Sequence, residues 1–183
     1  EMGLIAQPFI ETCQRIKQKY PDINFVVALV NEQRKKQFTE IWQTTAPELE
    51  FTLVEDTATN VITAADSVLL ASGTVALECM LLKRPMVVGY KVNKLTGYIV
   101  KKLAITDFVS LPNILAGEEI VKEHILEECH PDFLFPSVDK MLSADNSALI
   151  ERFTEMHHWI RKDADKQAAN AVLKLIGREF VES

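Results

Sequence analysis

The first ninety residues alternate apolar runs of strand length with amphipathic stretches of helical length. The apolar runs predict strands over 24–30, 51–54, 67–71 and 85–90. The amphipathic stretches predict helices over 4–20, 32–45, 59–65 and 74–82, with Asn31 as the cap of the second. After Asn24 the run 24–30 is continuously apolar, which is typical of a strand buried on both faces of a parallel sheet. The alternation therefore predicts an α/β fold with an open, doubly wound parallel sheet.

The second half of the chain has a different pattern. A further helix is expected from Asn93 or Thr96 to about Leu103, followed by a short fifth strand at Phe108 and Val109. Three helical stretches then follow, over 115–128, 131–142 and 144–178. We expect residues 1–143 to form the α/β domain and residues 144–183 a helical tail.

Composition narrows the class of protein. The chain has 183 residues, of which 48% are hydrophobic, enough for one domain with a substantial core. A formal charge of −6 argues against affinity of the whole chain for nucleic acid. Cys13, Cys79 and Cys129 show neither a CxxC pair nor metal-ligand spacing, so we expect reduced thiols. The amphipathic start without a preceding strand predicts that the chain is part of a longer polypeptide.

Basic residues are unevenly distributed. Six lie between positions 83 and 102, where no acidic residue occurs. Such a block forms either a solvated face or a surface for anionic ligands or anionic lipid. No apolar run approaches the roughly 20 residues that a membrane-spanning helix needs.

The candidate binding site begins with Ser72-Gly73-Thr74, between the predicted third strand and a helix. Ligands bind at the carboxyl ends of strands in doubly wound sheets, and a helix N-terminus offers unpaired N–H groups to a phosphate. The hydroxyls of Ser72 and Thr74 add donors, and Gly73 allows close approach to the backbone. The turn is therefore either a diphosphate cradle or only a helix cap.

A single carboxylate, Glu78, lies inside the apolar helix that follows. Thr74 and Glu78 are four residues apart, so they share one helix face about 6 Å apart along the axis. That is roughly the distance from the phosphates of a nucleotide to its ribose. A carboxylate there can accept hydrogen bonds from the ribose hydroxyls. The alternative is a general preference for an acidic residue near a helix N-terminus. The spacing does not fit a capping box.

Asn113 follows the predicted last strand, where it is either an N-cap or an amide directed into the same cleft. The chain contains no phosphate-binding loop of the GxxxxGK type, no GxGxxG and no recognisable nucleophile–base pair. We expect catalytic residues, and any metal site, to be absent from this chain.

Three motifs carry a resemblance to a known family. Residues 72–92 (SGTVALECMLLKRPMVVGYKV), 107–117 (DFVSLPNILAG) and 161–176 (RKDADKQAANAVLKLI) resemble the C-terminal half of lipid-A-disaccharide synthase. The resemblance implies a metal-independent, cofactor-free glycosyltransferase with two Rossmann-like domains facing a cleft (the GT-B plan). This chain corresponds to the donor-binding domain, and the N-terminal acceptor domain is absent from it.

The resemblance also implies a reaction and a cellular location. An inverting hexosyltransferase of this family moves 2,3-diacylglucosamine from UDP to 2,3-diacylglucosamine-1-phosphate (lipid X), giving a β-1,6-linked disaccharide phosphate and UDP. The family acts in the cytoplasm at the inner face of the inner membrane of Gram-negative bacteria. The general base lies in the other domain, so we expect the chain alone to be inactive. We also expect the terminal helix to pack differently here or to swap between chains of a homodimer.

By matched motif, Ser72, Gly73 and Thr74 contact the UDP phosphates, Glu78 contacts the ribose, and Asn113 lines the donor cleft. The loop near Val54 is expected to meet the uracil. A membrane-facing surface is expected from a basic and apolar set: Lys91, Lys94, Leu95, Tyr98, Lys101 and Lys102. Two alternatives remain. One is another UDP-sugar enzyme of this fold, such as a UDP-N-acetylglucosamine epimerase or a peptidoglycan-type transferase. The other is a non-catalytic nucleotide-binding module.

Overall fold

The computed structural model describes residues 2–29, 31–55, 57–92, 108–162 and 164–175. Its strands are β1 (Phe25–Ala28), β2 (Phe51–Val54), β3 (Val68–Ala71), β4 (Met86–Tyr90) and β5 (Lys122–Ile125). Its helices up to β5 are α1 (Met2–Lys19), α2 (Glu32–Thr45), α3 (Ala58–Ala64), α4 (Thr74–Leu81) and α6 (Leu111–Ala116). After β5 come the 3₁₀ turn η1 (Leu126–Glu128) and helices α7 (Pro131–Ser143), α8 (Ser147–Ile160) and α9 (Ala164–Leu175). The strands and helices predicted up to residue 90 are thus confirmed to within a few residues.

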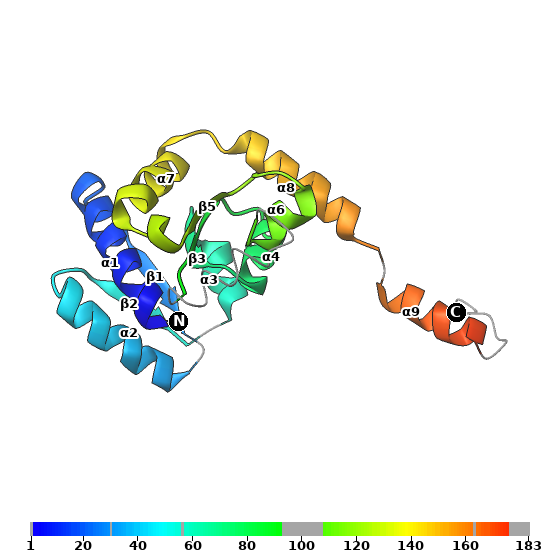
Figure 1. Cartoon of the computed structure of the whole chain (residues 1–183), viewed down its shortest axis with the longest axis horizontal. Helices are drawn as coiled ribbons and strands as arrows, with labels where there is room; N and C mark the ends of the chain where they lie inside the picture. The colour runs from blue at the N-terminus through cyan, green and yellow to red at the C-terminus, as the bar shows by residue number, and fades with distance from the viewer. Residues whose placement is uncertain (1, 30, 56, 93–107, 163, 176–183) are drawn as a thin grey trace.

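All strand pairs are parallel. β1 pairs with β2, and β4 lies between β3 and β5 (Figure 1). The described strands therefore form two ladders where the sequence predicts one open sheet, because β1 bonds to β2 whereas β3 bonds to β4. In the second ladder Ala71, Gly89 and His124 are in register, so the carboxyl ends of its three strands meet at one edge.

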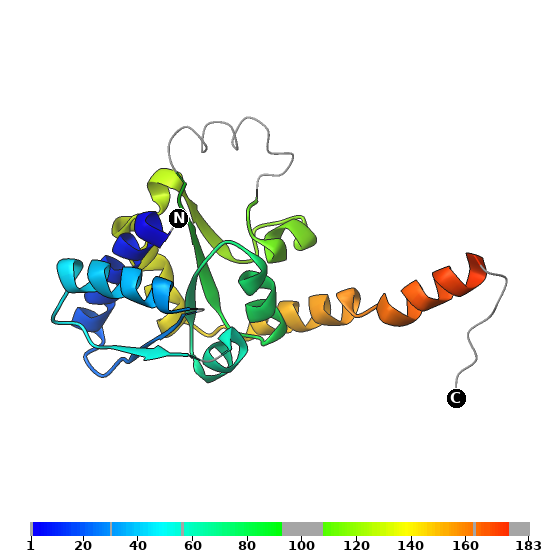
Figure 2. The same ribbon diagram turned by 90° about the horizontal axis from the view of Figure 1, so that it is seen from below.

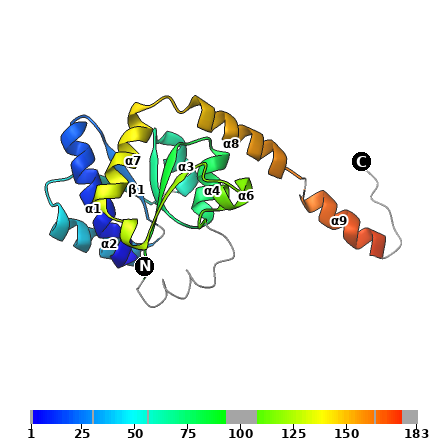
Figure 3. The same ribbon diagram turned by 45° about the horizontal axis from the view of Figure 1, so that its top comes forward.

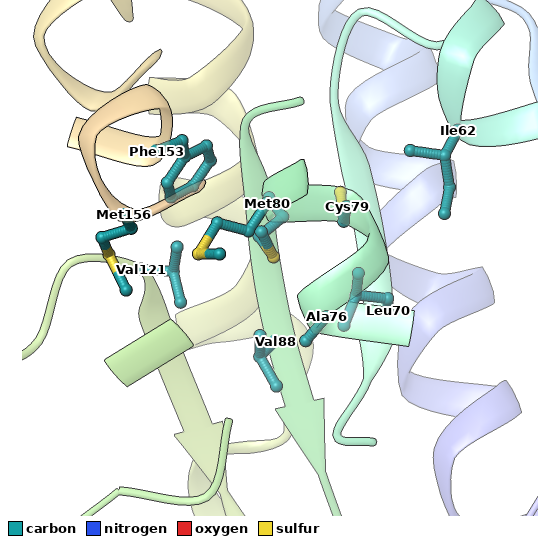
Figure 4. Packing of buried hydrophobic residues seen from close by; sticks show 10 residues of the cluster. Ile62, Leu70, Ala76, Cys79, Met80, Val88, Val121, Phe153 and Met156 are labelled. Atoms are coloured by element: carbon teal, nitrogen blue, oxygen red, sulfur yellow. The ribbon is translucent and has the colours of Figure 1, made fainter. Parts of the chain in front are cut away.

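Helices cover both faces of the β3–β4–β5 ladder, as a doubly wound fold requires. On one face Leu70 and Val88 join a core cluster that includes Met80 of α4 and Phe153 of α8 (Figure 4). On the other face Val87 packs with residues of α1 and α7, which lie against each other (Figure 3). Neighbouring residues of β4 thus point to opposite, equally buried sides. The predicted α/β class is confirmed.

Gly89 in β4 lies where helix α1 approaches the strand closely. A Cβ atom built on Gly89 would lie 2.7 Å from Cζ of Phe9 and 3.3 Å from Sγ of Cys129. Phe9 belongs to α1, so the missing side chain of Gly89 lets that helix pack directly on the strand.

The β1–β2 ladder has its own core with α1 and α2. Phe38 and Trp42 of α2 pack edge-on against Phe51 of β2. Asn31 caps α2 as predicted, accepting a hydrogen bond from the backbone N–H of Arg34 at 2.9 Å. The prediction that the first strand is buried on both faces is wrong. Val26 of β1 is 49% exposed, so one side of this strand is open.

The region after residue 107 differs most from expectation. Phe108 and Val109 are not a strand, because the Val109 N–H bonds to a side chain instead of a neighbouring strand. The helix predicted over 115–128 is also wrong. α6 ends at Ala116, Gly117 closes the helix with its left-handed backbone (φ 70°), and the chain then forms β5. The predicted helix between Asn93 and Leu103 lies outside the described residues.

The long terminal helix is divided in two. α8 ends at Ile160, and α9 follows as a separate helix that projects away from the α/β body (Figure 2). Phe153 and Met156 of α8 are buried in the core with α4, so α8 packs as part of the α/β body. The domain boundary near residue 143 stays a prediction.

Two further observations concern the described chain as a whole. None of its helices is both long and apolar enough to cross a membrane. The three cysteines are free thiols, and burial raises the pKa values of Cys13 and Cys79 to about 12. Thiols with such pKa values are structural and not reactive at neutral pH.

Candidate functional site

The turn Ser72-Gly73-Thr74 connects β3 to α4 at the carboxyl edge of the ladder. Gly73 occupies the N-cap position, and no side chain caps the helix. Gly73 and Thr74 are exposed, and a Cβ atom placed on Gly73 would meet nothing within 4 Å. The turn is therefore not a side-chain cap, and it leaves the first N–H groups of α4 open to a ligand.

The two hydroxyls of the turn differ in their surroundings. The Ser72 hydroxyl donates a hydrogen bond to the backbone carbonyl of Val109 at 2.7 Å. The Thr74 hydroxyl is at the exposed start of α4 and has no hydrogen-bond partner within the described ranges. Ser72 thus joins the turn to the loop before α6, and of the two Thr74 is the one whose hydroxyl can donate to a ligand.

Glu78 lies one helical turn after Thr74 on α4. Its neighbours Ala76, Cys79 and Met80 are fully buried, whereas Glu78 is only partly buried. Its carboxylate forms no hydrogen bond or ion pair within the part of the chain that the structure describes. The carboxylate therefore keeps its accepting capacity, and its predicted role as a ribose acceptor stays open beside a general helix preference.

Asn113 lies elsewhere than the sequence predicts. Its side chain is completely buried, and its Nδ2 donates to the carbonyl of Val121 at 2.8 Å and to Glu123 at 2.7 Å. Its Oδ1 accepts the backbone N–H groups of Ile120 and Val121, both at 2.9 Å. The N-cap interpretation is wrong, because Ser110 holds that position. An amide directed into an open cleft is also excluded, because all its hydrogen-bonding capacity is used internally. In this conformation the Asn113 side chain cannot contact the sugar donor. A contact through another part of Asn113 stays a prediction.

Glu123 on β5 is the main feature that sequence reasoning missed. It is 6% exposed and accepts three hydrogen bonds, from the N–H groups of Val109 and Ser110 (both 2.9 Å) and from Asn113. No cation pairs with it among the described side chains. A buried carboxylate is costly unless donors surround it, so this group organises the loop before α6. Treating 122–125 as a strand would have drawn attention to a carboxylate between buried positions.

The remaining predicted contacts are more distant in the fold. Val54 ends β2, and its carbonyl accepts the N–H of Leu29 at 3.3 Å, so it lies at the carboxyl end of the other ladder. Lys91 follows β4 and lines a pocket of about 280 Å³ with His130 and residues of α1. Lys94, Leu95, Tyr98, Lys101 and Lys102 lie outside the described residues, so the membrane-facing surface stays a prediction.

Within the described ranges, no group of three or more His, Cys, Asp or Glu side chains is placed to hold a metal ion. What the edge does offer is an open helix N-terminus, one exposed hydroxyl and one unpaired carboxylate in sequence along α4. These groups suit an anion followed by a pair of hydroxyls.

Comparison with known proteins bears on this arrangement. Residues 1–172 match the family model described as lipid-A-disaccharide synthetase. The chain is 72% identical over 182 residues to the lipid-A-disaccharide synthase of Aliivibrio salmonicida, covering 100% of this chain and 48% of that protein. It is 64% identical over 176 residues to the Vibrio cholerae enzyme of the same name, covering 96% of this chain and 46% of that protein. The chain thus spans about half the length of the curated relatives it matches.

Proposed function

The chain belongs to the lipid-A-disaccharide synthetase family, and on that premise we propose that it is the half of the enzyme that binds the UDP-sugar donor. One observation carries the proposal: the exposed start of α4, without a side-chain cap, is followed one turn later by Glu78, whose carboxylate has no partner among the described residues. The diphosphate oxygens accept hydrogen bonds from the N–H groups of the Gly73–Thr74 turn, and the Glu78 carboxylate accepts hydrogen bonds from the ribose hydroxyls. Ser72 takes part through its backbone and through its bond to Val109.

The proposed reaction follows the family. The 6-hydroxyl of 2,3-diacylglucosamine-1-phosphate attacks the anomeric carbon of UDP-2,3-diacylglucosamine, and UDP departs with the electron pair of the broken bond. Direct displacement inverts the anomeric centre and gives the β-1,6 linkage. The proton of the attacking hydroxyl goes to a base outside this chain. This half therefore binds and orients the donor and favours departure of UDP by stabilising its charge.

Further parts of the proposal concern the surroundings of the donor. The loop after β2, near Val54, contacts the uracil base of the nucleotide. The basic segment that begins at Lys91 rests on anionic headgroups at the inner face of the inner membrane. The protein acts there without a metal or another cofactor, and the chain alone does not turn over substrate because half of the cleft is missing.

Calorimetry with UDP tests the proposal. We expect the wild-type chain to bind with a Kd on the order of 0.1–1 mM, about −4 to −5.5 kcal/mol, and Glu78→Ala to lose detectable binding. Glu40→Ala is the matched control, because Glu40 is also a helical glutamate but lies exposed on α2. A folded wild-type chain that binds no UDP, or a Glu78→Ala chain that binds as well as wild type, would contradict the proposed site.

The other candidate functions make different predictions. Another UDP-sugar enzyme of this fold would bind UDP in the same way, so the assay that separates them is transfer between the two acylated sugars by this chain joined to its family's N-terminal half. A non-catalytic module would bind UDP but give no product in that assay. Membership of the family favours transfer.

A further inference from the structure

The buried carboxylate of Glu123 has no role in the function described so far. Its Oε2 accepts the N–H of Val109, and its Oε1 accepts the N–H of Ser110 and Nδ2 of Asn113. The donors come from the loop before α6 and from α6 itself, whereas Glu123 is on β5. Among the described residues, three neutral donors and no cation therefore surround a carboxylate that is 6% exposed.

One peptide group links this carboxylate to the nucleotide turn. In the peptide between Val109 and Ser110, the N–H of Ser110 donates a hydrogen bond to Oε1 of Glu123 at 2.9 Å. The carbonyl oxygen of Val109 accepts a hydrogen bond from the Ser72 hydroxyl at 2.7 Å. Hydrogen bonds on both ends of one peptide strengthen each other, because each polarises the group for the other. The negative charge of Glu123 thus acts, through that peptide, on the residue that precedes the open start of α4.

Asn113 keeps Glu123 in place from the other side. Its Nδ2 donates to the same Oε1 that receives Ser110, and its Oδ1 accepts two backbone N–H groups just before β5. The carboxylate therefore cannot change rotamer without leaving several buried donors unpaired. This gives the peptide at Val109, and with it Ser72, one fixed position.

We propose that Glu123 is a positioning residue for the nucleotide: its carboxylate fixes the Val109–Ser110 peptide and, through the Ser72 hydroxyl, sets the start of α4 in the geometry that receives the diphosphate. This inference rests on the proposed function, because it concerns the same site. Glu123 does not contact the ligand, and it acts through Val109 and Ser72.

Glu123→Gln is the informative variant. Glutamine has almost the same shape, but its amide group replaces one acceptor, so in either orientation an NH₂ group faces a backbone N–H or Asn113. We expect the fold to persist, the bond from Ser72 to Val109 to shift, and the affinity for UDP to fall about tenfold. Glu119→Gln is the matched control, since Glu119 lies four residues earlier and forms an ion pair with Lys122 at an exposed position.

The first readout needs no nucleotide. In amide NMR of the whole 183-residue chain, Glu123→Gln should move the signals of Ser72, Gly73 and Thr74, whereas signals of α2 stay in place and Glu119→Gln moves none of them. Unchanged signals at the turn, in a folded Glu123→Gln chain, would overturn the inference whatever the nucleotide does.

The second readout is a double-mutant cycle on UDP affinity with Ser72→Ala. If Glu123 acts through the Ser72 hydroxyl, Glu123→Gln should weaken UDP binding little further once that hydroxyl is gone. Additive losses in the two variants would contradict this and leave Glu123 a purely structural residue. If the wild-type chain binds no UDP at all, both the proposed function and the nucleotide role of Glu123 are contradicted. The amide signals then still decide whether Glu123 positions the turn.

Discussion

The β3–α4 turn and the loop before α6 are joined by a hydrogen bond at the carboxyl edge of the β3–β4–β5 ladder, and each has one glutamate nearby: Glu78 on α4 and Glu123 on β5. Glu78 is partly exposed and has no partner within the described ranges, whereas Glu123 is 6% exposed and accepts three hydrogen bonds. The carboxylate of Glu78 is therefore free to accept hydrogen bonds from a ligand, whereas that of Glu123 accepts hydrogen bonds from the protein itself. The difference comes from the supply of nearby N–H donors and not from the residue type.

This contrast separates binding from positioning. A carboxylate that has no internal partner can be removed with little effect on the fold, and its removal should affect the ligand. A carboxylate that satisfies three buried donors cannot be removed without cost, because those donors lose their acceptor. The two regions meet at the hydrogen bond between Ser72 and Val109, so a change in one is felt in the other.

The largest expected effect is on stability, from Glu123→Ala. Three buried donors would lose their acceptor, so we expect the free energy of unfolding to fall by about 3–5 kcal/mol. Glu78→Ala should change it by less than about 0.5 kcal/mol. Urea unfolding followed by circular dichroism measures both. Equal stabilities for the two variants would break the comparison.

Gly89→Ala tests the strand that separates the two regions. Gly89 is in register with Ala71 and His124, and a methyl group there would collide with Phe9 of α1. We expect a loss of about 1–3 kcal/mol in unfolding free energy, because α1 must move off the strand. Ala71→Ser, at the neighbouring position in register on β3, is a control of similar size. If Gly89→Ala unfolds at the same urea concentration as wild type, α1 does not pack as described.

Glu78→Gln sharpens the ribose assignment. The amide keeps one acceptor and loses the charge, so we expect UDP affinity to fall several-fold, up to about tenfold, with unchanged stability. Wild type should also prefer UDP over 2′-deoxy-UDP, and the variant should lose most of that preference. Titration of both nucleotides into both chains gives the four affinities. An undiminished preference in Glu78→Gln would assign the ribose to another residue.

The smallest effect is expected far from this edge, where α1 meets α7. Hydrogen bonds from Lys19 and Tyr20 hold the pKa of the Asp139 carboxyl below its ordinary value of 3.8. A lowered pKa stabilises the fold above pH ~4, and this contribution disappears as the pH falls through the lowered pKa. Asp139→Asn should therefore melt about 1–2 °C below wild type at pH 7.

The two melting temperatures should converge as the pH falls through the lowered pKa of Asp139, because the carboxyl is then protonated in both the folded and the unfolded wild-type chain. A gap that stays constant as the pH is lowered through the range in which this carboxyl takes up its proton would mean that the carboxylate charge is not what stabilises the interface.

The regions differ also in how well the sequence predicts them. The turn at Gly73 and the position of Glu78 on α4 follow from local patterns, because strand, turn and helix there are adjacent in the chain. The role of Glu123 does not, since its donors lie 10–14 residues away and reach it only once 122–125 forms a strand. Its segment, with acidic and apolar residues mixed, fits a helical period equally well.

The same reason explains Ser72 and Asn113. The acceptor of the Ser72 hydroxyl is 37 residues away in the chain, and the four bonds of Asn113 depend on a turn that the predicted helix over 115–128 would not contain. Hydrogen-bond partners set by tertiary structure decided which polar groups face inward. Sequence spacing alone left that choice open.

The most direct test of the central claim is a UDP titration of the whole chain followed on backbone amide signals. The account predicts saturable shifts that are largest at Gly73 and Thr74 and extend along α4 to Glu78. It also predicts little change at the pocket formed by α1, Lys91 and His130. No saturable shift in a folded chain, or shifts centred on that pocket, would contradict it.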